Sequence, residues 1–166
     1  METVTQRDAM KTVIDMYDWH TKQYKNAIDG IKDEDSYNRI NTKANHMSWI
    51  AGSMVQERYV LAQFLAVDMQ QTSHELFKDH KGIQDGATYP SLDEYRKDWE
   101  EISPALRSAL ENLTEEKLNS PGPWEMPGGT WNVFDTLVAC TDREAYCIGQ
   151  IGLWRRLLDY PAMKYE

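Results

Sequence analysis

The chain has 166 residues, of which 41% are apolar and 11% aromatic, so it has the size and composition of one folded domain. We expect a single domain over residues 1–166. The net charge is −9, from 27 acidic and 18 basic residues, and the basic residues form no block. Because nucleic-acid backbones select clustered Lys and Arg, we expect no nucleic-acid partner.

The hydropathy pattern gives no sign of a membrane segment. No apolar run approaches the roughly 20 residues that cross a bilayer, and residues 1–6 are polar, unlike a signal peptide. We therefore expect a cytoplasmic protein without a membrane partner. Cys140 and Cys147 are seven residues apart, which is about 10.5 Å along one helix, too far for a disulfide, so both are expected as free thiols.

Four segments have the three-four spacing of apolar residues that predicts helices. The first covers residues 6–29, with Thr5 and Asp8 as a capping pair and Gly30 as its stop. The second covers residues 43–66, is capped by Asn41 or Thr42, and is apolar over so much of its circumference that we expect it to be enclosed.

The third segment begins at the capping box Ser91 to Glu94 and continues in near-regular heptads to Leu113. Pro104 lies inside it and predicts a kink around Glu100. The fourth segment covers residues 130–159, after a stretch rich in Pro and Gly, and no segment has the alternation of a useful β-strand.

About two dozen residues separate the second and third helices, which is long for a connection within a compact domain. A connection of this length allows two neighbouring helices to run parallel. The sequence therefore predicts an all-α fold, a four-helix bundle with a long crossover connection between the second and third helices.

Two stretches resemble the DinB-like four-helix-bundle family. Residues 45–53 (Asn-His-Met-Ser-Trp-Ile-Ala-Gly-Ser) resemble its second-helix pattern, and residues 143–152 (Arg-Glu-Ala-Tyr-Cys-Ile-Gly-Gln-Ile-Gly) resemble its fourth-helix signature. Arg58, the Tyr89-Pro90-Ser91 entry to the third helix and residues 155–165 are also similar. The resemblance implies the DinB-like fold, and it implies a relation to metal-dependent hydrolases, thiol S-transferases and stress-induced proteins of unknown role.

The family's typical centre is a divalent metal held by three histidines, two of which are four residues apart on the fourth helix. Carried onto this sequence, those ligands fall on Ser53, Arg143 and Cys147. A guanidinium is a permanent cation that cannot ligate a metal and repels one. We therefore expect the family's metal site to be absent and no cofactor to be bound.

Two ion pairs are predicted in place of the metal. Glu57 follows Ser53 by one turn, so an Arg143–Glu57 pair would put a fixed positive charge where the metal charge would have been. Arg58 and Glu144 both belong to the family-like pattern and form the second predicted pair.

The candidate pocket residues are Ser53, Glu57, Arg143, Cys147 and His46. Cys147 is either a nucleophile activated by Arg143 or a small buried hydrophobe. His46 either lines the mouth of the pocket or is a partly exposed residue at a helix start. His20 is expected at the edge of the core. His74 and His80 lack the spacing of a metal site.

Three functions from different classes remain open. The leading one is a non-catalytic, stress-related or small-molecule-binding protein with a small anionic or aromatic ligand, in which Arg143 favours an anionic group. The second is an enzyme, a residual metal-dependent hydrolase or thiol S-transferase that uses zinc or nickel recruited by Cys147 and His46, or metal-free thiol chemistry. The third is a structural or interaction protein, and a homodimer is expected. The six tryptophans either fill the core or wall an aromatic pocket, with Trp124 and Trp131 the strongest candidates for the latter.

Overall fold

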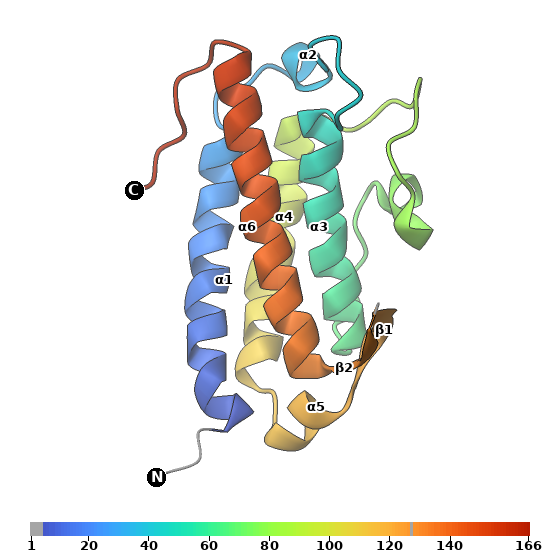
Figure 1. Cartoon of the computed structure of the whole chain (residues 1–166), viewed down its shortest axis with the longest axis vertical. Helices are drawn as coiled ribbons and strands as arrows, with labels where there is room; N and C mark the ends of the chain where they lie inside the picture. The colour runs from blue at the N-terminus through green and yellow to red at the C-terminus, as the bar shows by residue number, and fades with distance from the viewer. Residues whose placement is uncertain (1–4, 127) are drawn as a thin grey trace.

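The computed structural model describes residues 5–126 and 128–166, which are mostly helical, and confirms the all-α prediction. Four long helices lie side by side (Figure 1). They are α1 (Gln6–Ile28), α3 (Met47–Phe64), α4 (Leu92–Glu111) and α6 (Val133–Leu157). Each packs against two of the others, so that α1 and α3 are separated by α4 on one side and by α6 on the other.

The contacts give the directions of the helices. Arg58 of α3 reaches Ser103 of α4, and the Ser48 hydroxyl, near the start of α3, faces the Pro90 carbonyl just before α4. The helices α3 and α4 therefore run the same way, and residues 65–91 return along the outside of α3 to join them (Figure 1). By the same reasoning α1 and α6 run parallel, since Arg155 binds the Ala27 carbonyl and His20 lies beside Glu144.

Short elements occupy the connections. Between α1 and α3 lies α2 (Asp33–Ser36), and within residues 65–91 lie two single 3-10 turns, η1 (His74–Leu76) and η2 (Lys78–His80). After α4 come α5 (Glu115–Asn119) and an antiparallel hairpin of β1 (Pro121–Met126) and β2 (Gly129–Asn132). The prediction of no useful strand was wrong here, because the hairpin is held by its backbone pairing and its sequence shows no apolar alternation.

Capping explains where the long helices begin. Thr5 with Asp8 and Ser91 with Glu94 both form the predicted capping boxes. The helix α3, however, begins at Met47 and not near Lys43. The side chain of Arg39 donates to the carbonyls of Lys43 and Ala44, which fixes that segment as a turn, and His46 provides the cap.

The other helix boundaries also differ in part from the prediction. The helix α6 begins at Val133, three residues later than expected, because Asn132 and Asp135 form a capping box there. Gly30 has a left-handed φ of 69° directly after the end of α1, as a helix stop requires. The helix α4 continues through Pro104 as one element. Among the described residues, no helix is both long and apolar enough to cross a bilayer.

Candidate functional site

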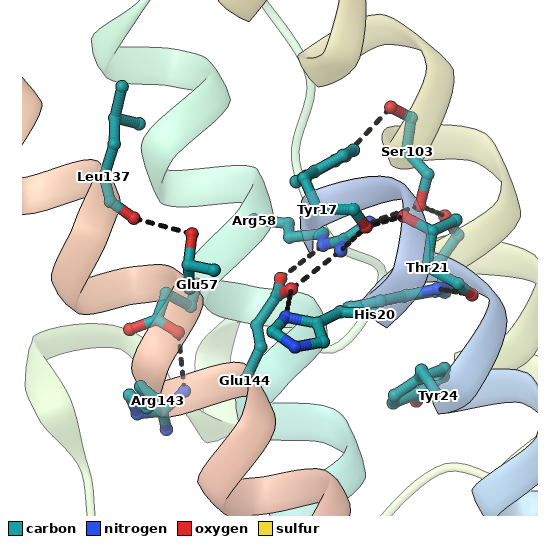
Figure 2. Close-up of polar contacts among 12 residues, drawn as sticks. Tyr17, His20, Thr21, Tyr24, Glu57, Arg58, Ser103, Leu137, Arg143 and Glu144 are labelled. Atoms are coloured by element: carbon teal, nitrogen blue, oxygen red, sulfur yellow. Dashed lines mark hydrogen bonds and ion pairs between the residues drawn. The ribbon is translucent and has the colours of Figure 1, made fainter. Parts of the chain in front are cut away.

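A bidentate ion pair between Arg58 and Glu144 lies in the centre of the helix assembly. Arg58 Nε lies 2.5 Å from Glu144 Oε1, and Arg58 Nη2 lies 2.9 Å from Glu144 Oε2. Both side chains are almost fully buried. This confirms the predicted pair and places it between α3 and α6 (Figure 2).

The remaining donors of Arg58 are also satisfied. Its Nη1 donates to the hydroxyls of Thr21 at 2.7 Å and Ser103 at 2.8 Å, and its Nη2 reaches the Tyr17 carbonyl. The guanidinium also stacks on two rings, 3.8 Å from the centroid of Tyr17 and 3.6 Å from that of Trp99. A buried charge that is paired and hydrogen-bonded in this way fixes the relative positions of all four long helices.

The carboxylate of Glu144 is ionised within this cluster. Burial favours the neutral acid, but the Arg58 guanidinium outweighs it and holds the pKa of Glu144 below its ordinary value. His20 contributes as well, since its Nδ1 lies 3.3 Å from Glu144 Oε2. His20 is buried against the ion pair and also lines a hollow between α1 and α6, so it lies at the edge of the core as expected.

A second ion pair is formed by Glu57, the residue before Arg58 on α3, and Arg143, the residue before Glu144 on α6. It lies on the opposite side of the α3–α6 contact from the first pair. Arg143 Nη1 lies 2.7 Å from Glu57 Oε2, and Arg143 Nη2 lies 3.2 Å from the Ser53 hydroxyl. Figure 2 shows Arg143 and Glu57 meeting on one side of the α3–α6 contact, and Glu144 and Arg58 meeting on the other. The predicted Arg143–Glu57 pair is confirmed, and Ser53, Glu57 and Arg143 are brought together.

The carboxyl of Glu57 has an unusual protonation equilibrium. Burial raises its pKa to about 7, and the neighbouring Arg143 only partly opposes this rise. The side chain of Arg143 is 35% exposed, whereas that of Glu57 is 18% exposed. The guanidinium is therefore the more accessible member of the pair.

These side chains form part of the wall of a pocket of about 490 Å³ between α3, α6, the hairpin and the long connection. This is within the usual range for small-molecule sites. Aromatic side chains from three separate segments, Trp49, Phe77 and Trp124, supply its apolar surface. Phe77 packs directly over Gly52, where a Cβ atom would come within 2.4 Å of its ring.

Two side chains of the pocket wall each contain a buried polar atom without a partner. Trp49 Nε1 and Gln56 Oε1 are buried and have no hydrogen-bond partner among the described residues. Gln56 Nε2 lies 2.9 Å from His74 Nδ1, which fixes the amide so that its oxygen is the unpaired atom. The wall of the pocket therefore contains one buried unpaired donor and one buried unpaired acceptor.

The rim of the pocket contains strained backbone and basic side chains. Asp79 and His80 both have left-handed φ values, 57° and 56°, which cost energy for residues other than glycine. Lys78, His80 and Lys81 line the same rim, and Lys78 pairs with Glu75. Residues held in such conformations cluster at functional sites, so this turn adds weight to the pocket as a site.

Cys147 is close to this cluster but does not line the pocket. Its thiol lies one turn after Arg143 and is 5% exposed. Burial raises the pKa of Cys147 to about 11, and the Arg143 charge offsets only part of that rise. Of the two sequence interpretations, the arrangement matches the small buried hydrophobe, because a reactive cysteine requires a lowered pKa. Cys140 is likewise buried and free.

His46 lies outside the pocket, which corrects its place among the candidate residues. Its Nδ1 accepts from the Trp49 backbone N–H at 3.1 Å, so it caps α3 about 10.5 Å along the helix from Ser53. The ring is buried between Tyr37 and Tyr89. Burial and the nearby Arg39 lower its pKa to about 4, which keeps it neutral.

The residues at the three family ligand positions do not fit a metal ion. Arg143 is a cation, Ser53 already donates to the Ile50 carbonyl, and Cys147 is held as a thiol. Over the ranges 5–126 and 128–166, no group of three or more His, Cys, Asp or Glu side chains is arranged to hold a metal.

Sequence reasoning missed much of the pocket wall. Phe77, Lys78 and Lys81 come from the long connection, where no sequence pattern predicts a pocket. Only in the folded chain does the strained turn at Asp79 and His80 mark their position. His74 and His80 lie in the pocket wall, and Trp124 does so as predicted, whereas Trp131 does not line it. No protein-family model matches this chain, and no curated protein is similar to it.

Proposed function

We propose that the protein is a DinB-like four-helix bundle with a long crossover connection between the second and third long helices. We further propose that this protein has lost the family's metal centre and binds a small aromatic anion instead. The parallel α3 and α4, joined by residues 65–91, support the fold part of this proposal. The resemblance of residues 45–53 and 143–152 to the family patterns supports the relationship.

The position of Arg143 in the pocket wall is the observation that supports the proposal most strongly. It stands at a family ligand position, its guanidinium lines the pocket, and its charge is independent of pH. A guanidinium in a partly desolvated wall is suited to carboxylate, sulfonate or phosphate groups, which it binds through paired N–H donors.

The rest of the pocket defines the other end of the ligand. Trp49, Phe77 and Trp124 provide flat apolar surfaces for a ring. An aromatic ring bearing one acidic group matches this arrangement, and the lysines at the rim favour its approach.

We favour binding over catalysis because the thiol chemistry that a transferase needs is opposed at Cys147. The thiolate is the nucleophile in such reactions, and the pKa of Cys147 is raised to about 11. Ser53, Arg143 and Cys147 provide no metal-ligand set at the family's positions, because Arg143 is a cation and Cys147 is held as a thiol.

Two fluorescent probes with the same ring system test the proposal. We expect 8-anilinonaphthalene-1-sulfonate, an aromatic anion, to bind more tightly than the neutral N-phenyl-1-naphthylamine. The variant Arg143→Gln should weaken sulfonate binding by about 10- to 100-fold, the value of a charged hydrogen bond, and leave the neutral probe unchanged. Arg107→Gln, an arginine on the surface of α4, is the matched control. Equal sulfonate affinity in the Arg143→Gln variant and the unmodified protein would overturn the proposal.

A further inference from the structure

The last part of the long connection forms an outer wall of the ligand pocket. Residues 78–81 line the pocket, and residues 79–82 and 84–86 are exposed to solvent. Figure 1 shows this part of the connection (bright green) beside α3, outside the four long helices. We refer to residues 78–86 as the flap. A wall made of exposed chain can move without disturbing the core.

The flap makes few contacts outside the connection. Gln84 Nε2 donates to the Leu76 carbonyl at 3.1 Å, and both residues belong to the connection. Over residues 5–126 and 128–166, no hydrogen bond joins the flap to any of the four long helices. An ion pair of 3.2 Å joins Asp85 to Arg39, but the Asp85 side chain is almost fully exposed. Exposed pairs of this kind contribute little to stability, so the flap is held weakly.

Two buried aromatic side chains fasten the ends of the flap. Phe77, directly before it, packs over Gly52 of α3. Tyr89, shortly after it, accepts a hydrogen bond at its hydroxyl from the Gln84 backbone N–H, at 3.0 Å. The chain between these two attachments crosses the wall of the pocket.

The backbone near both attachments is suited to act as a hinge. Asp79 and His80 have left-handed φ values of 57° and 56°, which cost energy for residues with a side chain. Gly86 has a φ of 79°, and a Cβ atom there would meet nothing within 4 Å. Because opening releases the strain at Asp79 and His80, the observed arrangement and an open one are close in free energy.

We propose that the flap opens and closes over the ligand pocket, between fixed attachments at Phe77 and Tyr89. Asp79, His80 and Gly86 are its hinges. The open flap admits the ligand, and the closed flap covers it. This inference rests on the proposed function, because it assigns the regulation of the same pocket.

The charges on the flap couple its closure to an anionic ligand. Lys78, His80 and Lys81 line the pocket with one acid, Asp79, so the basic side chains of this wall outnumber the acidic ones. An anion held by Arg143 attracts these basic groups, and a neutral aromatic molecule does not. A ligand shifts an equilibrium only by binding one arrangement better, so the anion favours the closed flap and its neutral analogue does not.

The distance between two spin labels measures the position of the flap. Gly82→Cys puts one label on the flap and Glu101→Cys puts the other on α4, and both positions are exposed. Cys140 and Cys147 are buried, so the unmodified protein should take up no label. In double electron–electron resonance we expect two distances without ligand. 8-Anilinonaphthalene-1-sulfonate should leave one of them, and N-phenyl-1-naphthylamine should leave both.

Tyr89→Phe loosens one attachment without touching the pocket wall. It keeps the ring and removes the hydroxyl that holds Gln84, so the open population should rise by about 2- to 10-fold, the value of one neutral hydrogen bond. Tyr59→Phe is the matched control, since it removes a buried hydroxyl that donates to the Asp98 carbonyl, away from the flap. Tyr59→Phe should leave both populations unchanged.

Stopped-flow binding of 8-anilinonaphthalene-1-sulfonate gives a second readout. If opening precedes binding, the observed rate should level off at high probe concentration, at a limit that Tyr89→Phe raises by the same factor. A single distance without ligand, or populations that Tyr89→Phe leaves unchanged, would overturn the flap. If the sulfonate does not bind at all, the proposed function fails, and the two distances measured without ligand still decide whether the flap moves.

Discussion

Arg143 and Glu57 meet at 2.7 Å where the resemblance to the DinB-like family predicts a metal ligand. The pair puts a permanent cation in the pocket wall and a carboxyl with a raised pKa directly beside it. This pairing makes the electrostatics of the pocket depend on pH, although Arg143 itself does not titrate.

We predict that aromatic anions bind more tightly as the pH falls through the pKa of Glu57, which burial raises to about 7. Above that pH the carboxylate occupies Arg143 and repels a second anion. Below it the neutral acid releases the guanidinium. Titrations with 8-anilinonaphthalene-1-sulfonate from about pH 6 to about pH 8 should show affinity falling by up to about tenfold per pH unit above the pKa.

The variant Glu57→Gln is the control for this pH dependence. It keeps the shape of the side chain and removes the titrating group, so the affinity should be high and flat over the same range. An unchanged slope in that variant would contradict the role assigned to Glu57.

The Arg58–Glu144 pair gives a prediction about stability. Glu144→Gln leaves the Arg58 charge buried without its partner, which should reduce the free energy of unfolding by about 3–5 kcal/mol. Asp15→Asn, which breaks an exposed pair with Lys11, should change it by less than about 0.5 kcal/mol. Denaturant unfolding of both variants measures the difference.

The double variant Arg58→Leu with Glu144→Leu should be more stable than Glu144→Gln alone. Both charges are then absent, and the hydroxyls of Thr21 and Ser103 keep other partners, the carbonyls of Tyr17 and Trp99. If the double variant lost as much stability as the single variants Arg58→Leu and Glu144→Leu combined, the pair would not act as a coupled unit.

Local patterns predicted the helices, and the resemblance to the DinB-like family led to the prediction of both ion pairs. The segment of residues 6–29 agrees with the observed α1 (Gln6–Ile28), and the capping box at Ser91 gave the start of α4. The Arg143–Glu57 pair was predicted from the family's ligand position and from Glu57 following Ser53 by one turn, and the Arg58–Glu144 pair from the family-like pattern; both pairs are observed.

Features that depend on distant contacts were not predictable. The turn held by Arg39 makes α3 begin later than the sequence pattern predicted. The hairpin is held by backbone pairing, which requires no alternation of apolar side chains, so the sequence did not indicate it. His46 appeared to be a pocket candidate because of its place in the motif, but Tyr37 and Tyr89, remote in sequence, bury it as a cap. Phe77 reaches the pocket only through the folded connection.

We predict that neither cysteine reacts as an activated thiol. Cys147 is buried and its pKa is raised to about 11, and burial also raises the pKa of Cys140 well above its ordinary value. Alkylation by iodoacetamide near neutral pH should be slower than that of free cysteine by about 100-fold or more, and should become fast in denaturant. Fast labelling of Cys147 in the folded protein would restore the thiol transferase hypothesis.

Restoring the family's ligands tests the relationship itself. The triple variant Ser53→His, Arg143→His and Cys147→His puts three imidazoles at the family positions and removes the repelling cation. We expect it to bind zinc or nickel with a stoichiometry of about one, while the unmodified protein binds neither, as measured by calorimetry and elemental analysis. A folded triple variant without metal affinity would contradict the placement of the family's site at these three residues.

A crystal structure of the protein soaked in 4-bromobenzoate, in which anomalous scattering locates the bromine, tests the aromatic-anion site most directly. We expect the ring between Trp49, Phe77 and Trp124, with its carboxylate on the Arg143 guanidinium. A bromine bound elsewhere with this pocket unfilled would contradict the aromatic-anion site, and an anomalous metal peak beside Ser53 and Cys147 would contradict the loss of the metal centre.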